Sequence, residues 1–481
     1  MIATLLIAIP VGGALALWLL PWRNTWRACL LAVLLAVAEV GLWIGAVAGF
    51  DFGSSRLQYD LHATWFADLG ASYKVGLYDW SLWLVGLTVI VTTAALAYGA
   101  RAGRERPRAY FGLLLFLAGA TVGVFTAQDL LLFYVFFEAM MIPLYILIGG
   151  WGGPGRLGAT LKFVVYTLAG SLLMLVAIIA FGLDQGTFDM TKLGSSSNTW
   201  IFLGFLAAFA VKAPLFPFHG WLPDAYREAP AEVTAVLSGV ISKTAAYGLL
   251  RIVIPHFPDP VANWRVTVLA LASIGLVYAS LLAFRAPDIR GVIAYSSLAQ
   301  MCLIVIGLFA VNDSGLDGAL LQMVNHGFVS ASLFLLAGGI ETRAGTGQLS
   351  RLGGMARGRP VLASLLITTG VIALAVPGST AFAGEFLVLN GIFARGWGWA
   401  VAGAVAIVLA AMYVLRLVSA VLHQDVGSAV PAHARDLRLA EVGILAPLVA
   451  VLLALSFWPA AITDHAFGGR PSSTVAAQFK E

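Results

Sequence analysis

Charged side chains are scarce in this sequence. Asp, Glu, Lys and Arg make up 11% of its 481 residues, whereas a soluble protein carries about 25%, and 60% of the residues are hydrophobic. This balance excludes a soluble globular protein and predicts an integral membrane protein. The net charge of +4 forms no basic face, because the arginines fall in short connections, so we expect no nucleic-acid partner.

Cysteine is scarce too. Cys29 and Cys302 are the only two, and they lie in apolar stretches far apart in the sequence. Two isolated cysteines cannot hold an iron–sulfur cluster, and we expect no disulfide between them. The G-x-G-x-x-G pattern from Gly150 to Gly155 joins two apolar segments, whereas a dinucleotide site needs a strand before it. The sequence therefore predicts no metal and no bound cofactor in this chain.

Long apolar runs dominate the chain instead. At about 20 residues per crossing, the sequence divides into fourteen segments, which predicts an all-α integral membrane protein with about 14 transmembrane helices. The predicted helices lie near 2–20, 26–48, 80–99, 109–127, 130–149, 160–182, 200–218, 232–254, 264–284, 290–310, 317–340, 361–394, 398–422 and 439–461.

Lys and Arg are shared unequally between the two sides that these helices define. One set of connections carries about twice as many of them as the other. The positive-inside rule places the richer side in the cytoplasm. We therefore expect both termini to face outward.

Two of the predicted helices are interrupted. Pro214 and Pro217 break the seventh, and Pro377 with Gly378 breaks the twelfth. Proline removes a backbone donor, and the carbonyls that it frees need partners that lipid cannot supply. Protein groups or water must therefore lie beside both breaks.

The two breaks belong to an internal repeat. The decapeptides that begin at Gly158 and Gly318 share four residues, and they place Tyr166 opposite His326. These segments lie in the sixth and eleventh predicted helices, and the same shift of five relates the two broken helices. Helices five apart cross in opposite directions, so two inverted five-helix repeats follow. The predicted organisation is an N-terminal three-helix segment (1–108), a first repeat (109–254), a second repeat (264–422) and a C-terminal helix and tail (423–481).

Five ionisable side chains fall at similar depths in five of these helices. They are Glu138, Lys212, Lys243, His326 and Glu385. A lysine at the centre of a bilayer costs about 2.5–3.5 kcal/mol on insertion scales, so such residues are rarely without a role. A row at one depth suits proton transfer parallel to the membrane plane. Two structural alternatives stay open: a static Glu138–Lys212 ion pair, and a His326 that only completes a hydrogen bond.

Several motifs resemble the antiporter-like subunits of respiratory complex I, which are related to subunits of Mrp-type sodium/proton antiporters. The carrying segments are Val211–Pro214, Pro217–Ala225, Glu228–Pro230, Lys243–Arg251, Phe133–Pro143, Asp288–Ser297, His326-Gly327 and Phe382–Phe386. That family has fourteen helices, two of them broken. L-type and N-type subunits and the Mrp chains generally have lysine where this chain has Glu385, so the chain is similar to the M-type subunits.

The resemblance implies a role for each member of the row. Glu138 and Lys212 would form the ion pair of the pump, Lys243 the central relay, His326 a connecting group and Glu385 the terminal group near the exit.

The chain departs from the family at two positions. Gln300 and Tyr226 stand where the family often has histidine. An amide cannot carry a proton as a cation, so Gln300 would relay through a chain of water. Tyr166 is a second candidate relay, and Tyr226 is expected at the cytoplasmic surface.

The resemblance also implies a function. The chain would be a proton-translocating membrane-arm subunit of NADH:quinone oxidoreductase in the bacterial inner membrane, flanked by L-type and N-type subunits. FMN, iron–sulfur clusters and quinone would belong to other subunits. The alternatives are an Mrp-type Na+/H+ antiporter chain, the membrane subunit of a proton-pumping nickel–iron hydrogenase, and a structural scaffold.

Overall fold

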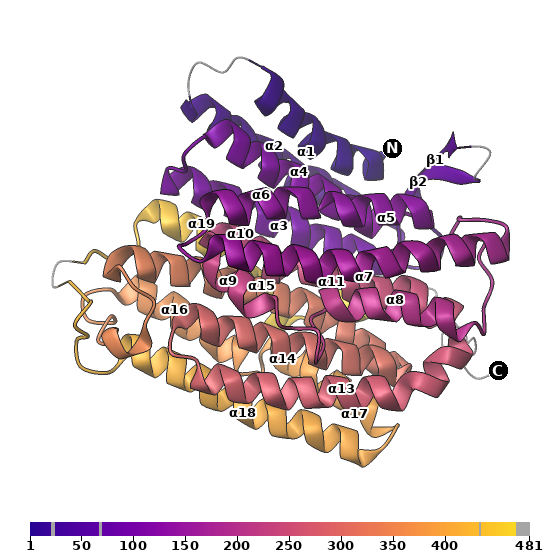
Figure 1. Cartoon of the computed structure of the whole chain (residues 1–481). Helices are drawn as coiled ribbons and strands as arrows, with labels where there is room; N and C mark the ends of the chain where they lie inside the picture. The colour runs from indigo at the N-terminus through magenta and orange to yellow at the C-terminus, as the bar shows by residue number, and fades with distance from the viewer. Residues whose placement is uncertain (21–24, 67–69, 432–433, 468–481) are drawn as a thin grey trace.

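The computed structural model describes residues 1–20, 25–66, 70–431 and 434–467, which form a bundle of roughly aligned helices (Figure 1). In this part of the chain, 12 helical spans are long and apolar enough to cross a membrane. The predicted all-α membrane fold is confirmed. The count of fourteen stays a prediction, because it requires each broken segment, built from shorter helices, to count as one crossing.

The elements follow one another in two groups. Up to the first break they are α1 (Ile2–Leu19), α2 (Thr25–Ala48), β1 (Gln58–Phe66), β2 (Ala71–Leu77), α3 (Asp79–Ala102), α4 (Pro107–Thr126), α5 (Leu130–Ala139), α6 (Met141–Trp151), α7 (Arg156–Gln185) and α8 (Thr199–Lys212). The remainder are α9 (Leu222–Glu228), α10 (Ala231–Val236), η2 (Leu237–Ile241), α11 (Ser242–Gly248), η3 (Leu249–Val253), α12 (Ile254–His256), α13 (Pro258–Arg285), α14 (Ile289–Ala310), α15 (Asp313–Ala344), η4 (Leu349–Arg351), α16 (Pro360–Ala373), α17 (Thr380–Phe393), α18 (Trp397–Leu422), α19 (Leu439–Phe457) and α20 (Ala460–Thr463).

The antiparallel hairpin of β1 and β2 was not predicted from the sequence. Two buried carboxylates hold it to the bundle. Asp129 accepts hydrogen bonds from the backbone and hydroxyl of Ser72 at 2.9 and 3.2 Å, while its other oxygen caps the start of α5. Lys74 donates to both oxygens of Asp189 at 2.8 Å. The hairpin therefore fixes one end of α5, the helix that carries Glu138.

Helices end at both predicted breaks. α8 ends at Lys212, and α9 begins ten residues later at Leu222. α16 ends at Ala373 and α17 begins at Thr380, with Gly378 between them at a φ of 95°. This backbone conformation favours glycine, because at a positive φ a Cβ would be strained against the adjacent backbone.

Two spans form the centre of the bundle. Every residue in the most apolar window of Ala231–His256, and likewise of α15, is buried. In contrast, 22% of the corresponding window of α2 is buried, and Figure 1 shows α1 and α2 at one edge of the bundle. Polar residues on the two central spans are therefore surrounded by protein rather than lipid. The division into two inverted repeats stays a prediction, and residues 468–481 of the predicted C-terminal tail lie outside the described residues.

Candidate functional site

Four of the five predicted ionisable side chains lie inside the bundle. The exposed fractions of Lys212, Lys243, His326 and Glu385 are 4%, 0%, 5% and 2%. Each comes from a different helix: α8, α11, α15 and α17, respectively. Because an ionisable group is costly to bury without partners, the contacts of these four residues decide what they can do.

Lys243 and His326 touch. The Nζ of Lys243 lies 2.7 Å from the Nδ1 of His326 and donates a hydrogen bond of 2.6 Å to the carbonyl of Ser238. Nδ1 accepts when Lys243 is protonated and can donate when Lys243 is neutral, because a histidine ring nitrogen takes either role. One proton can therefore move between the two residues without a change of fold.

The helix that carries Lys243 is irregular at that point. The π-helical segment η2 ends at Ile241, and a second, η3, begins at Leu249. π-helical turns are rare, and they occur frequently at functional sites. Lys243 lies on the short helix α11 between the two segments.

Three serine hydroxyls from three elements, η2, α14 and α15, meet close to Lys243. The Oγ of Ser238 lies 2.9 Å from the Oγ of Ser297 and 2.5 Å from that of Ser330. All three side chains are buried. Each hydroxyl can donate and accept, so the cluster can pass a proton along its hydrogen bonds. We call Ser238, Ser297 and Ser330 the serine cluster.

Glu385 contacts Gln300, as the sequence suggested. Gln322 contacts Gln300 in turn, which the sequence did not suggest. Gln300 donates a hydrogen bond of 2.9 Å to Oε1 of Glu385, and Gln322 donates one of 2.7 Å to Oε1 of Gln300. Glu385 and Tyr413 also line a cavity of about 10 Å³, the size of about one water molecule. The site therefore joins a carboxyl group, two amides and a space that fits one water molecule.

Helix α15 connects these two groups of contacts. His326, which contacts Lys243, lies four residues after Gln322, which contacts Gln300. Side chains four residues apart lie on the same face of a helix, about 5–6 Å apart at Cβ. The chain of contacts is thus Lys243, His326, one helical turn of α15, Gln322, Gln300 and Glu385.

Lys212 is held where α8 ends. Its Nζ donates to the carbonyl of Phe137 at 3.1 Å and lies 3.6 Å from the centre of the Phe137 ring, a cation–π contact. The indole of Trp221 donates to the carbonyl of Val211 at 2.9 Å. A protein group, rather than water, is thus the partner of this carbonyl at the break.

The expected direct ion pair between Glu138 and Lys212 is not formed. Both residues are described, and Lys212 contacts the residue that precedes Glu138 rather than its carboxylate. Glu138 is half-buried, and its Oε1 has no hydrogen-bond partner among the described residues. Glu138 lines an open groove of about 670 Å³ together with Tyr134, Ile142 and Tyr145, while its Oε1 is itself buried. Hence Glu138 lies at the edge of the bundle, unlike the other four.

Tyr166 lies apart from the chain of contacts. It is half-buried on α7 and packs so closely on Gly220, in the break after α8, that a Cβ at Gly220 would come within 3.0 Å of its hydroxyl. Tyr166 therefore borders the break beside Lys212, and its role as a relay stays a prediction.

The sequence missed several members of the site. Gln322 and the serine cluster were not singled out, although uncharged polar residues in the most apolar helices were the available signal. Tyr226 was expected at the surface and is fully buried, with its ring 5.6 Å from that of Phe334. The expectation failed because the short helix α9 folds Tyr226 inward against α15.

A family model described as the transmembrane region of NADH:quinone oxidoreductase and Mrp antiporters matches residues 127–410. Among curated proteins, the NADH-quinone oxidoreductase subunit M of Rhodobacter capsulatus is 37% identical over 436 residues, covering 87% of this chain and 85% of the relative. The subunit M of Rickettsia typhi is 35% identical over 442 residues and covers 90% of each.

A solved structure agrees with these relatives. A chain of respiratory complex I from Thermus thermophilus with bound NADH superposes with a TM-score of 0.90 at 30% identity, covering 100% of both chains. The match thus includes both broken segments and every residue of the site described above. The chain therefore belongs to the family of NADH:quinone oxidoreductase and Mrp antiporter transmembrane subunits, among the antiporter-like M subunits of respiratory complex I.

Proposed function

We propose that this chain translocates protons as a membrane-arm subunit of NADH:quinone oxidoreductase, along the row Glu138, Lys212, Lys243, His326 and Glu385. The contact of 2.7 Å between Lys243 and His326 carries the proposal, because it joins two ionisable groups that lipid cannot reach. The amides of Gln322 and Gln300 extend the row to Glu385. The chain holds no redox centre of its own in this proposal; FMN, iron–sulfur clusters and quinone act in other subunits.

The first step of the stroke lies at Lys212. The ammonium group rests on the carbonyl and ring of Phe137, one residue from Glu138. A small movement would close the ion pair with Glu138, and its reversal would release the proton toward Lys243. Moving one proton against ~150 mV costs about 3.5 kcal/mol. Leaving one charge of a fully buried pair without its partner costs about 3–5 kcal/mol, so an event of this kind is of the size required.

Neighbouring subunits complete the site at Glu138. The groove beside this carboxylate is lined mainly by apolar and aromatic side chains and opens on the outside of the bundle. An unpaired carboxylate facing lipid would be costly. We therefore place an L-type or N-type membrane-arm subunit against this groove and the other type at the opposite end of the chain. Movements of these subunits would supply the signal that disturbs Glu138 and Lys212.

The proposal also includes the orientation of the chain in the membrane. The arginine-rich connections lie at the cytoplasmic face of the bacterial inner membrane, and both termini lie at the outer face.

The test replaces Lys212 by Ala and Glu138 by Gln in the intact complex. Inverted membrane vesicles are supplied with NADH, and proton uptake is followed with a pH-sensitive dye, while native gels report assembly. We expect normal assembly and proton uptake lowered at least about tenfold, because each change removes a positioned proton-transfer group. Lys192→Ala is the matched control, since Lys192 lies in a connection and its side chain is 72% exposed.

Three other outcomes would redirect the proposal. Normal assembly together with normal proton uptake in both variants would indicate that the chain is a structural scaffold. Sodium-dependent proton exchange in vesicles without NADH would indicate an antiporter. Co-purification with a nickel–iron subunit in place of a flavin-bearing one would indicate a hydrogenase.

A further inference from the structure

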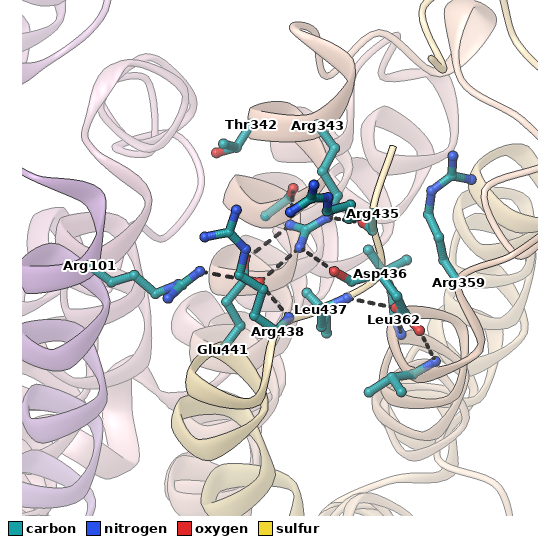
Figure 2. Close-up of polar contacts among 12 residues, drawn as sticks. Arg101, Thr342, Arg343, Arg359, Leu362, Arg435, Asp436, Leu437, Arg438 and Glu441 are labelled. Carbon is teal, nitrogen blue, oxygen red and sulfur yellow. Dashed lines mark hydrogen bonds and ion pairs between the residues drawn. The ribbon is translucent and has the colours of Figure 1, made fainter. Parts of the chain in front are cut away.

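A cavity of about 390 Å³ opens where α3 and α15 end and α19 begins. Four arginines line it: Arg101 from α3, Arg343 from α15, and Arg435 and Arg438 from the segment before α19. Among the described residues that line it, Glu441 is the only carboxylate. Figure 2 shows these side chains gathered around the start of α19, with Arg101 and Arg343 joined to Glu441 by dashed lines. We call this cavity the arginine pocket.

The one carboxylate of the arginine pocket is already engaged. Glu441 accepts hydrogen bonds from both terminal nitrogens of Arg343, at 3.1 and 2.9 Å, and from the backbone of Arg438 at 2.8 Å. Arg101 lies 3.7 Å from the same carboxylate. Within the described parts of the chain, Arg435 and Arg438 form no ion pair. The pocket therefore keeps a large excess of positive charge.

A second carboxylate nearby, Asp436, is engaged mainly by backbone N–H groups. Asp436 accepts hydrogen bonds from the backbone N–H groups of Val361, Leu362 and Leu437 at 2.9, 3.0 and 2.7 Å. It thereby caps the start of α16, as Figure 2 shows. Its charge also acts on Arg343, so Asp436 offsets part of the charge of the four arginines and leaves the pocket positive.

The backbone that presents the two unpaired arginines is held in place. Arg343 donates to the carbonyls of Arg435 and Asp436 at 2.8 and 3.1 Å, and Arg359 donates to the carbonyl of Ala434 at 2.9 Å. Ordering these groups before a ligand arrives lowers the entropic cost of binding. The pocket is thus built, rather than a chance meeting of surface side chains.

We propose that the arginine pocket binds a phosphate group, either that of an anionic phospholipid headgroup or free phosphate. The planar guanidinium fork matches the oxygens of a phosphate, and several forks from different elements can share one group. The pocket lies at the ends of three membrane helices, the level at which headgroups lie, and basic pockets of this kind bind anionic headgroups. Its volume suits a headgroup and is small for a folded protein segment.

The test measures binding to the intact complex in detergent. Radiolabelled short-chain phosphatidylglycerol and, separately, radiolabelled inorganic phosphate are titrated, and bound label is counted after gel filtration. Arg435→Gln with Arg438→Gln is the test variant; both side chains are exposed, so the fold should be kept. Arg285→Gln with Arg357→Gln is the matched control, because these arginines are exposed and lie outside the pocket lining.

We expect the test variant to lose about 25-fold in affinity, at about fivefold for each removed charge, and the control to bind as the wild type does. Phosphatidylglycerol binding that inorganic phosphate does not displace would assign the site to lipid. Saturable binding of inorganic phosphate alone would assign it to the free anion. The proposal would be overturned if the test variant bound as well as the wild type or if the wild type did not bind. It would also be overturned by a cross-link that places an acidic segment of another subunit in the pocket.

Discussion

Lys243 and His326 share a hydrogen bond of 2.7 Å at the centre of the bundle, where neither side chain reaches lipid. Helix α15 turns His326 toward Lys243 and, one turn earlier, Gln322 toward Gln300. A single helix thus links the lysine on the irregular span to the carboxyl group beyond the second break. Replacing His326 or Gln300 should therefore interrupt proton transfer along the row.

Replacing His326 by Leu should lower proton pumping at least about tenfold, because an apolar side chain cannot accept a proton from Lys243. Oxidation of NADH with a water-soluble electron acceptor should stay unchanged, because that reaction does not use this chain. The measurement is proton uptake per NADH oxidised in inverted vesicles. Ser332→Ala is the matched control, since Ser332 is buried on the same helix and its hydroxyl has no hydrogen-bond partner among the described residues. Equal pumping by both variants would remove His326 from the row.

Gln300 offers a graded test of the link to Glu385. Gln300→Leu removes the donor to Glu385 and the acceptor of Gln322, so pumping should fall about as far as in the His326 variant. Gln300→His keeps a group that donates and accepts, so pumping should be largely kept. Vesicle assays of the two variants side by side provide the comparison. If the leucine variant pumped as well as the histidine variant, the amide chain would not lie on the path.

The serine cluster should matter for both stability and pumping. Ser238→Ala leaves the hydroxyls of Ser297 and Ser330 without their shared partner, which should cost about 1–3 kcal/mol in stability. It also interrupts the hydroxyl path beside Lys243, so pumping should slow. Thermal unfolding and proton uptake are measured together. Ser273→Ala is the control, because its hydroxyl is buried and makes no hydrogen bond within the described residues; an equal effect of both variants would show a general packing defect.

The carboxyl group of Asp189 should make the stability of the folded chain depend on pH. Burial by itself raises the pKa of this carboxyl, but hydrogen bonds from Lys74 and Thr191 outweigh burial and hold the pKa below its usual value. A lowered pKa in the folded state stabilises the fold above the unfolded pKa, about 3.9, and this contribution is lost as the pH falls through the folded value. Asp189→Asn should therefore lower the midpoint of thermal unfolding by a few degrees near neutral pH.

The difference between the wild type and Asp189→Asn should shrink as the pH falls below about 4, because the wild-type carboxyl then loses its charge. Unfolding of the purified complex is followed across that range. Asp184→Asn serves as the control, since Asp184 is exposed and, within the described parts of the chain, its carboxylate accepts a hydrogen bond only from the neighbouring Gln185. A difference that stayed constant down to acidic pH would contradict the assigned role of the Lys74 contact.

Much of the site could be predicted because charge inside an apolar helix is conspicuous. Lys212, Lys243 and Glu385 stand out in runs of apolar residues, and proline marks the break beside Lys212. Glu138 stood out in the same way, yet the sequence could not show that it lies at the edge of the bundle. Periodicity identifies which residues share one face of a helix, and it does not say which neighbour covers that face.

The sequence by itself determined the membrane location, the family resemblance and the positions of the buried charges, since these depend on composition and local spacing. Only the tertiary structure decided which of these groups meet. Lys243 and His326 are 83 residues apart, and Gln300 and Glu385 are 85 apart, so packing of distant helices alone brings them together. The same packing holds Lys212 against Phe137 rather than Glu138, because contacts between distant residues depend on where the backbone of each helix lies.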